Sequence, residues 1–519
     1  MSRDRFDLPI SRRRFLELVA ASAAMTAAGC DFGSPVLPGD PFTLGVASGD
    51  PLADRVVLWT RLAPTPLAPD GAAGMPPVPV TVFWEVANDE AFRSIVRAGS
   101  AVADPSLGHS VHVDVNGLAP DRWYFYRFHA DGHVSPVGRT RTFPAPSAAP
   151  ALMRFASASC QNWKSGYYTA HHHLAQEDLD FVAFLGDYIY ESGVGGEVRD
   201  HDGPRIETLA GYRNRYALYK SDPNLAEAHR RFPWLVTWDD HEVANNYAGE
   251  LRDENGAPYP VPFLDLRAWA YQAWYENTPV RLLPPKGASF RIYRDLAFGD
   301  LAKLFVLDTR QYRTDQDCND RALDPICATF PNPDGDMLGA AQESWLLGGL
   351  AASNARWNVM AQQVVFSPTP IGTRLNFDQW DGYPFARQRI VDFLRARPLR
   401  NSVILTGDIH ASGVGWVPGQ TPGAPSTFSD PIASEFVATG ISSGGLDEGT
   451  ASLIELLFNS YPHVEYFEAV SRGYVRHEVT RDAWRADYRF VETVLEESSP
   501  ISTAVSFVVE HGDPRPQPA

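Results

Sequence analysis

The larger part of the chain, from about residue 151 onward, contains short apolar segments that each end in a cluster of polar residues. These segments and the residues that end them are 152–158 with Ser159 and Cys160, 181–185 with Gly186 and Asp187, 234–238 with 239–241, 304–307 with Asp308, and 403–405 with Gly407 and Asp408. Helical stretches such as 166–176 lie between several of them. The alternation predicts an α/β domain over residues 151–500 with largely buried strands. Because α/β folds build their sites just past strand ends, the polar clusters mark the candidate site.

Residues 41–145 have a different pattern, which indicates a small all-β domain. The segments that carry this pattern are 78–86, 111–115 and 123–128, with a turn signal at Asn116-Gly117. The motif Leu118-x-Pro120 followed by Tyr124-x-Tyr126 resembles fibronectin type III domains. Residues 144–150 are rich in proline and alanine, which is typical of a linker. We therefore expect a β-sandwich that positions or shields the larger domain.

The N-terminal 30 residues have the pattern of an export signal. Ser11-Arg12-Arg13-Arg14-Phe15-Leu16 precedes a short alanine-rich stretch, 19–29, and the twin arginines indicate the Tat route. The stretch is too short for a stable membrane span. We expect the Tat export machinery as a partner and a periplasmic, cell-surface or secreted protein. Ala27-Ala28-Gly29-Cys30 resembles a lipoprotein cleavage box. A lipid anchor at Cys30 and ordinary cleavage nearby without a lipid both remain open.

The net charge limits the possible partners, and the cysteines predict one disulfide and one unpaired thiol. The formal net charge is −18, which argues against a general nucleic-acid-binding surface. Cys318 and Cys327 lie nine residues apart in one segment, and in an oxidising compartment they are expected to form a disulfide. Cys160 is then unpaired, and an unpaired cysteine in an exported protein suggests a specific role.

Four of the polar clusters together hold carboxylates, imidazoles, a thiol and a phenol. In chain order they are Ser159-Cys160-Gln161-Asn162, Gly186-Asp187-Tyr188-Ile189-Tyr190-Glu191, Asp239-Asp240-His241-Glu242 and Gly407-Asp408-Ile409-His410. A single Gly-Asp after a strand is usually a turn, whereas four such clusters in this order indicate one joint site. Their order resembles the metallophosphoesterase pattern, which runs Asp-x-His, Gly-Asp, Asn-His-Glu/Asp and Gly-His-x-His.

The departures from that pattern resemble the PhoD-type alkaline phosphatases, which pair iron(III) with calcium. A cysteine stands in the first cluster, an aspartate replaces the asparagine before His241, Asp408 replaces the first histidine of the last pair, and Tyr190 follows Asp187 by three. The resemblance covers about residues 41–480, including the opening 45–51. It implies a metallophosphoesterase-type α/β domain, layered as an α/β/β/α sandwich. It also implies an exported alkaline phosphatase and phosphodiesterase that hydrolyses phosphate esters with a metal-activated hydroxide.

The resemblance also implies a metal-ligand set, and the ligand types agree with it. A thiolate, a phenolate and an imidazole favour a transition metal, so Cys160, Tyr190 and His410 are expected to hold iron(III). Carboxylates without nitrogen favour a hard cation, so Asp240 and Asp408 are expected to hold calcium. Asp187 would bridge the two ions, and five anionic ligands would balance a 3+/2+ pair. Either Asn245 or Asn246 could add an oxygen ligand, or could serve only as a turn or cap residue; we assign Asn246.

The expected roles of the remaining candidates follow from their positions. His241 stands where the family has its active-site histidine and could protonate the leaving group, or else serve as a core or supporting histidine. Asn162 could donate a hydrogen bond to the phosphoryl group. Arg310 follows a predicted strand and could reach the substrate phosphate, or else form a structural ion pair.

Three other functions fit the sequence less well. The same site could act on phospholipid diesters in the manner of a phospholipase D. A conventional purple acid phosphatase is disfavoured because Asp240 and Asp408 replace that family's ligands. A non-catalytic cell-surface binding protein would have no use for a pair of ions that activates water.

Overall fold

A computed structural model of the chain describes residues 36–519 apart from 202, 254–255, 319–322, 397–400 and 420–429. The expected export segment and Cys30 lie outside these described residues. Among the residues described, no helix is both long and apolar enough to cross a membrane.

The described chain is organised around two large mixed sheets. The strands of the first sheet, in spatial order, are β24 (Gln517–Pro518), β23 (Ile501–Glu510), β22 (Ala483–Val491), β21 (Arg472–Thr480), β9 (Leu152–Ala158), β10 (Phe181–Phe184), β11 (Pro233–Val236), β1 (Val46–Gly49), β2 (Val56–Arg61) and β5 (Ser110–Val115). Those of the second are β12 (Arg294–Phe298), β13 (Ala302–Val306), β15 (Trp357–Ala361), β17 (Ser402–Thr406), β19 (Pro431–Val437), β18 (Ser412–Pro418) and β20 (Val464–Glu468). Within them, β9, β10 and β11 run parallel, as do β13, β15, β17 and β19.

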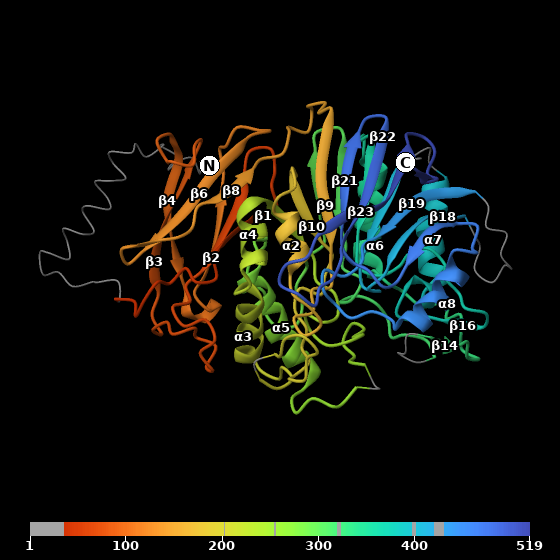
Figure 1. Cartoon of the computed structure of the whole chain (residues 1–519), viewed down its shortest axis with the longest axis horizontal. Coiled ribbons are helices and arrows are strands. Elements are labelled where there is room, and N and C mark those ends of the chain that lie inside the picture. Colours follow the sequence, from red (N-terminus) through yellow and green to blue (C-terminus); the bar gives the residue numbers. More distant parts are fainter. Residues whose placement is uncertain (1–35, 202, 254–255, 319–322, 397–400, 420–429) are drawn as a thin grey trace, which may run out of the picture.

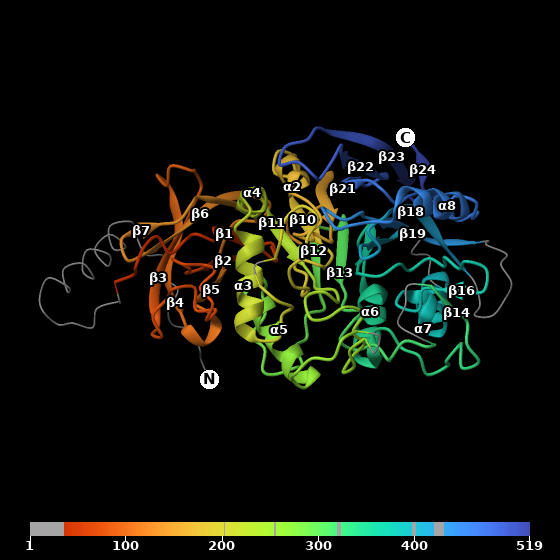
Figure 2. The same ribbon diagram turned by 60° about the horizontal axis from the view of Figure 1, so that its bottom comes forward.

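Helices cover the outer faces of the two sheets. Near the first sheet lie α2 (Thr169–Leu174), α3 (Leu209–Lys220), α4 (Pro223–Arg231) and α5 (Phe263–Asn277). Near the second lie α6 (Gly339–Ala352) and α7 (Pro384–Arg395), while α8 (Glu448–Phe458) packs beside β20. Figures 1 and 2 show α3 and α5 on one side of the central strands and α6 and α7 on the other. The remaining short elements are the 3-10 turns Pro105–Leu107 and Trp380–Gly382 and the pair β14 (Asp324–Pro325) and β16 (Arg374–Leu375).

The alternation of side chains along β10 shows why these layers form. Phe181 and Ala183 point into the core between the two sheets, whereas Val182 and Phe184 point into the core beneath α3 and α5. Successive side chains of a strand face opposite sides of the sheet, so a strand that is apolar throughout needs cover on both. The second sheet and the helices supply that cover.

The strands of the N-terminal β region are divided between two sheets. Its strands β3 (Val80–Ala87), β4 (Ile95–Ala103), β6 (Trp123–Ala130), β7 (His133–Val134) and β8 (Gly138–Arg141) form a separate five-stranded sheet. The facing strands β1, β2 and β5 instead extend the large first sheet, because β1 pairs in parallel with β11 through Ser48 opposite Pro233 and Gly49 opposite Trp234. This pairing covers the edge that β11 would otherwise expose.

A buried ion pair ties the end of β1 to the second sheet. Asp50 is 2% exposed, and one of its carboxylate oxygens accepts hydrogen bonds from Arg294 Nε at 2.9 Å and Nη2 at 2.7 Å. Its other oxygen accepts from the backbone N–H of Arg281 at 2.8 Å. Arg294 also donates to the Val236 carbonyl at the end of β11, so three strands from both sheets meet at this guanidinium.

We expect Arg294→Leu to destabilise the fold. It leaves the Asp50 carboxylate buried without its charged partner, and removing one member of a buried pair costs roughly 3–5 kcal/mol. The midpoint of urea unfolding should fall clearly. The control Arg55→Leu removes a solvent-exposed pair with Asp54, for which roughly 0–1 kcal/mol is expected. Equal midpoints for the two variants would contradict the structural role of the buried pair.

Candidate metal centre

The polar clusters expected from the sequence meet where the two sheets come together. Cys160 follows β9, Asp187 follows β10 and Asp240 follows β11, all in the first sheet, whereas Asp408 and His410 follow β17 of the second. A parallel bridge between Ser159 and Gly440 joins the strand ends of the two sheets directly. The site therefore lies at the carboxyl ends of parallel strands.

Several of these residues have unusual backbone geometry. The φ angle is +56° at Cys160, +57° at Asp187, +64° at Asp408, +55° at His410 and +51° at Asn246. Residues other than glycine rarely adopt this left-handed region, at a cost on the order of 1–3 kcal/mol each. Such strain concentrates at functional sites, where the surrounding structure holds side chains in a required position.

One half of the site contains a sulfur, a phenol and an imidazole. Ligand atoms of Cys160, Asp187 and His410 lie within 4.8 Å of one another. The hydroxyl of Tyr190 lies 2.6 Å from Asp187 Oδ2 and 2.9 Å from His410 Nε2. Burial, together with the charge of Asp187, raises the pKa of both the Cys160 thiol and the Tyr190 phenol well above their usual ranges. A bound cation would oppose this effect, because metal ligands bind as anions.

The other half is dominated by carboxylates. Ligand atoms of Asp187, Asp240 and His241 form one group within 4.8 Å, and those of Asp239, Asp240 and Asp408 form another. Burial raises the pKa of Asp240 to about 6 despite the nearby Arg310 guanidinium, and it also raises that of Asp408. Gathering buried carboxylates in this way costs free energy unless positive charge is brought among them.

The residues present fit a pair of metal ions. Asp187 Oδ1 and Asp240 Oδ1 are buried and have no hydrogen-bond partner among the described residues, although Arg310 Nη2 lies 3.5 Å from the latter. Buried polar atoms in native proteins are nearly always satisfied, so unpartnered oxygens facing a cluster of ligands indicate a cation. Asp187 belongs to both ligand groups and could bridge two ions.

The two histidines are oriented by their second ring nitrogens. His410 Nδ1 lies 2.6 Å from the Gly444 carbonyl oxygen, to which it must donate, and this contact directs Nε2 toward the Tyr190 hydroxyl. His241 Nδ1 lies 2.7 Å from a carboxylate oxygen of Glu191, and its ring packs on Tyr190 with centroids 4.1 Å apart. Burial opposes a charge on His241, but Glu191, Asp240 and Asp187 together raise its pKa well above the usual range.

Arg310 does not have the substrate-binding position expected from the sequence. Its side chain is completely buried, and its guanidinium donates to Asp239, to Asp378 at 2.8 and 2.9 Å, and to Asp408 at 2.9 Å. All of its nitrogens are therefore directed at carboxylates of the protein. These contacts fit the structural ion pair that the sequence left open as the alternative. The sequence could not decide between the two roles, because it shows a strand end but not the acidic residues that surround it.

The three candidate asparagines differ in their position relative to the site cavity. Asn246 lines the site cavity, and its backbone N–H donates to Asp240 Oδ2 at 2.7 Å. Asn245 also lines the cavity, and its side chain donates to Asp253. Asn162 is not among the cavity-lining residues, and its side-chain oxygen accepts from the backbone N–H of Lys164 at 3.0 Å. Its role in substrate binding stays a prediction.

Several residues beside the candidate ligands hold them in place. Glu242 accepts hydrogen bonds from the backbone N–H groups of Asp187, Tyr188 and Asp239, and so it fixes two ligand loops. Ser443 Oγ lies 2.7 Å from both the Tyr190 hydroxyl and the Cys160 carbonyl oxygen.

Arg472 donates to the carbonyl oxygens of Ser443 and His410, and so it connects the last two strand-end loops. Ser443 follows the buried strand β19, so the strand-end signal could have identified it. No comparable signal marks Arg472, which lies within a strand.

The two cysteines that were expected to pair do so in the structure. Cys318 and Cys327 form a disulfide with a Cα–Cα distance of 5.5 Å. Cys160 is 1% exposed and has no disulfide partner among the described residues.

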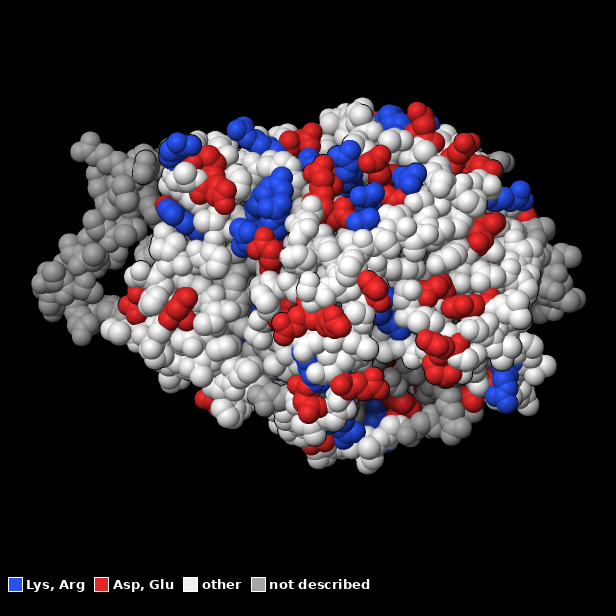
Figure 3. Space-filling view, in the orientation of Figure 1, with Lys and Arg blue, Asp and Glu red and all other residues white. Residues whose placement is uncertain are grey.

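A cavity of about 250 Å³ opens over these ligands. Its lining includes Asp187, Asp240, His241, Asp408 and His410. On the molecular face shown in Figure 3, basic side chains form small groups among acidic ones. Together with the net charge of −18, this places the attraction for an anionic ligand within the site itself.

Comparison with known proteins agrees with this geometry. The model of the PhoD-like phosphatase family matches residues 155–488, and that of the PhoD-like phosphatase N-terminal domain matches residues 29–144. Alkaline phosphatase D of Bacillus subtilis (strain 168) is 48% identical over 481 residues, which covers 91% of this chain and 81% of the relative. A solved structure described as "Structure of PhoD" superposes with a TM-score of 0.88 at 46% identity, covering 94% of this chain and 93% of that one. The chain therefore belongs to the PhoD-like phosphatase family.

Proposed function

We propose that this protein is an exported alkaline phosphatase and phosphodiesterase whose site holds iron(III) and calcium. The observation that carries the proposal is a pair of ligand groups that share Asp187, one with sulfur, phenol and imidazole donors and one with carboxylates. The homology to alkaline phosphatase D, a phosphoric ester hydrolase, supports the same reaction class. The enzyme is thereby favoured over a non-catalytic surface protein.

The donor sets support the choice of ions. Cys160, Tyr190 and His410 would hold iron(III), since sulfur, phenolate and imidazole donors favour a transition metal. Asp240 and Asp408 would hold calcium, which prefers oxygen ligands, with Asp187 shared and Asn246 as a further oxygen donor. When bound there, the two ions would supply positive charge for phosphoryl oxygens and would lower the pKa of a water molecule.

We assign His241 the role of proton donor to the leaving alcohol. It lines the cavity, and Glu191 holds its Nδ1, so that Nε2 remains for a group within the cavity. The hydrogen bond from the backbone N–H of Asn245 to Glu191 Oε1 at 3.0 Å fixes the carboxylate in turn. A histidine held by a carboxylate is well suited to transfer a proton at a fixed position.

We also propose the order of the layers in the fold, the type of the N-terminal domain and the route of export. We assign the two sheets and their outer helices to an α/β/β/α metallophosphoesterase sandwich, and the N-terminal β domain to a fibronectin III-like module. The Tyr124 hydroxyl supports the latter, because it bonds back to Ala119 as in the tyrosine corner of related sandwiches. Arg12-Arg13 and the disulfide support Tat export to an oxidising compartment, with Cys30 as a possible lipid site.

Turnover of phosphate esters tests the proposed reaction and the role of His241 together. Metal-loaded wild-type protein should hydrolyse 4-nitrophenyl phosphate and bis(4-nitrophenyl) phosphate. His241→Asn should lower kcat for n-butyl phosphate about 100-fold. The loss should be smaller for 4-nitrophenyl phosphate, because 4-nitrophenolate leaves without a proton. The exposed helix residue His172 provides the control His172→Asn, for which no change is expected. Equal losses for the two leaving groups would argue for a binding role, and no turnover of either aryl ester would exclude the reaction.

The identity of the metals can be tested by spectroscopy. Protein purified after native export should contain iron and calcium and show a visible tyrosinate-to-iron(III) charge-transfer band, which Tyr190→Phe should abolish. Tyr188 is equally buried but bonds to His229, so Tyr188→Phe should keep the band. Two zinc ions in place of iron and calcium would refute the assignment.

A substitution of Arg310 can distinguish a role in positioning the proposed ligands from a role in binding the substrate. Arg310→Lys should lower the metal content at limiting metal, since supporting residues typically contribute about 10–100-fold to metal affinity. The KM of fully loaded enzyme should stay nearly constant. Arg294→Lys is the control, because Arg294 is likewise paired with a buried carboxylate, Asp50, and its hydrogen bonds reach none of the proposed ligands. A raised KM with unchanged metal content would restore the substrate-contact interpretation.

A further inference from the structure

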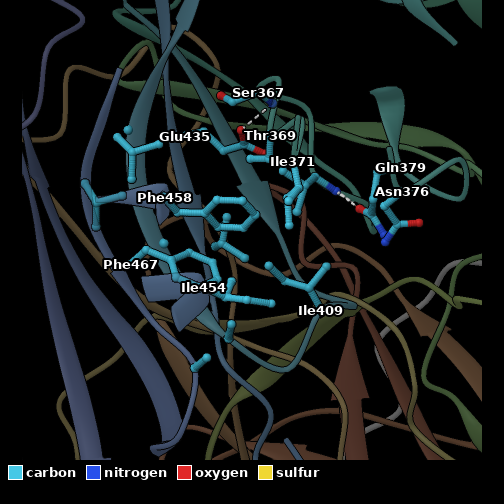
Figure 4. Close-up of a pocket in the computed structure, with 18 of the residues that line it drawn as sticks. Ser367, Thr369, Ile371, Asn376, Gln379, Ile409, Glu435, Ile454, Phe458 and Phe467 are labelled. Atoms are coloured by element: carbon cyan, nitrogen blue, oxygen red, sulfur yellow. Dashed lines mark hydrogen bonds between the residues drawn. The ribbon is translucent and has the colours of Figure 1, made fainter. Parts of the chain in front are cut away.

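A second, apolar pocket lies beside the metal site. It has a volume of about 200 Å³ and is bounded by α8, β18, β20 and the segment after β15. Figure 4 shows the side chains of Ile409, Ile454 and Phe458 around a common space, with Phe467 and Ile371 near its edge. Ile454, Phe458 and Phe467 also belong to one apolar cluster, which gives the wall a fixed shape.

The apolar pocket and the metal-site cavity share part of their walls. Asn376, Gln379, Ile409 and His410 line both of them. Ile409 lies in the chain between the proposed ligands Asp408 and His410. Gln379 spans the boundary, since its Nε2 donates to Asp408 Oδ2 at 2.5 Å while its Oε1 accepts from the backbone N–H of Val365. The two cavities therefore adjoin at these four residues.

The carboxyl group of Glu435, which lines this pocket, is satisfied by hydrogen bonds from the protein. Glu435 is 2% exposed, and its Oε1 accepts from the Phe366 N–H at 2.8 Å and from the Thr406 hydroxyl at 2.7 Å. Its Oε2 accepts from the Ser367 N–H at 2.7 Å. Because these oxygens are satisfied by the protein, the pocket selects an occupant by shape and apolar surface rather than by charge.

We propose that this pocket binds the apolar alcohol group of the phosphate ester while the phosphoryl group lies at the metal site. This inference rests on the proposed phosphatase function and adds a substrate class to it, namely esters of compact apolar alcohols. An engineered protein cavity of about 150 Å³ binds benzene, so a pocket of this size accommodates one ring or a chain of about six carbons. Two long acyl chains exceed it.

A series of n-alkyl phosphates tests the proposal in wild-type enzyme. Ethyl, n-butyl and n-hexyl phosphate have alcohols of nearly equal leaving ability, so intrinsic reactivity stays constant while apolar area grows. Phosphate release should give a kcat/KM for n-hexyl phosphate at least about tenfold above that for ethyl phosphate, since burial of each methylene is favourable. Octyl and decyl phosphate should bring little further gain. Hydrolysis of ethyl and hexyl phosphate at equal efficiency would overturn the pocket assignment and leave the phosphatase function standing, whereas no turnover of any ester would overturn the function itself.

Two variants of the pocket change its size in opposite directions. Ile454→Trp fills it and should bring the hexyl-to-ethyl ratio of kcat/KM close to one. Phe458→Ala enlarges it and should move the best substrate to a longer chain. Leu456→Trp is the matched control, since Leu456 lies on the same helix but is 74% exposed. Each ratio is measured within one protein preparation, so it does not depend on the fraction that has folded. An unchanged ratio in Ile454→Trp would refute the assignment.

Binding without turnover provides an independent measurement. Calorimetric titration of metal-loaded enzyme should show n-hexylphosphonate binding more tightly than ethylphosphonate, with a more negative heat-capacity change that reports apolar burial. Ile454→Trp should remove the difference between the two phosphonates, and Leu456→Trp should retain it. Equal affinities of the two phosphonates for wild-type enzyme would contradict the proposal.

Discussion

The concentration of buried carboxylates is the constraint on which the rest of the site depends. Asp187, Asp239, Asp240 and Asp408 follow strands of the two sheets, Asp378 joins them from the segment after β16, and little of their surface is exposed. Like charges in a poorly solvated place repel strongly, so the arrangement requires cations and donors of fixed geometry. Arg310 satisfies the inner side of the cluster, and the proposed metal ions would satisfy the side that faces the cavity. Arg310 thus helps to hold the ligands in place rather than the substrate.

The two-sheet architecture brings these charges together and keeps them there. Gln363 connects the strand ends below the site, since its side-chain nitrogen donates to the Thr237 hydroxyl and to the carbonyl oxygens of Trp238 and Leu307. Glu242 and Arg472 hold the loops above it. The left-handed backbone at Cys160, Asp187 and His410 is tolerated because packed sheets and hydrogen bonds on both sides determine it. Rigid support of this kind is what a pair of closely spaced metal ions requires.

The sequence predicted several strands that are buried on both faces, although it did not identify β15 and β18, which are also buried throughout. The expected segments 152–158, 181–185 and 403–405 correspond to β9, β10 and β17, because continuous apolar runs bounded by polar residues leave few alternatives. The N-terminal region was predicted less completely. Its strands β3, β5 and β6 were recognisable from the sequence, but the pairing of β1 with β11 joins residues nearly two hundred positions apart and leaves no local trace. The same limit explains Arg310, whose carboxylate partners come from three other segments of the chain.

By itself, the sequence determined the family and the chemical types of the candidate ligands, because these are carried by short motifs at strand ends. Cys160, Asp187, Tyr190, Asp240, Asp408 and His410 could be named in this way, and the structure places them together. Only the tertiary structure decided which residues support them and what else the site adjoins. The roles of Glu242 and Arg472 and the apolar pocket beside His410 depend on contacts between distant segments. Burial and proximity across the fold are set by packing, which a linear pattern of residues does not specify.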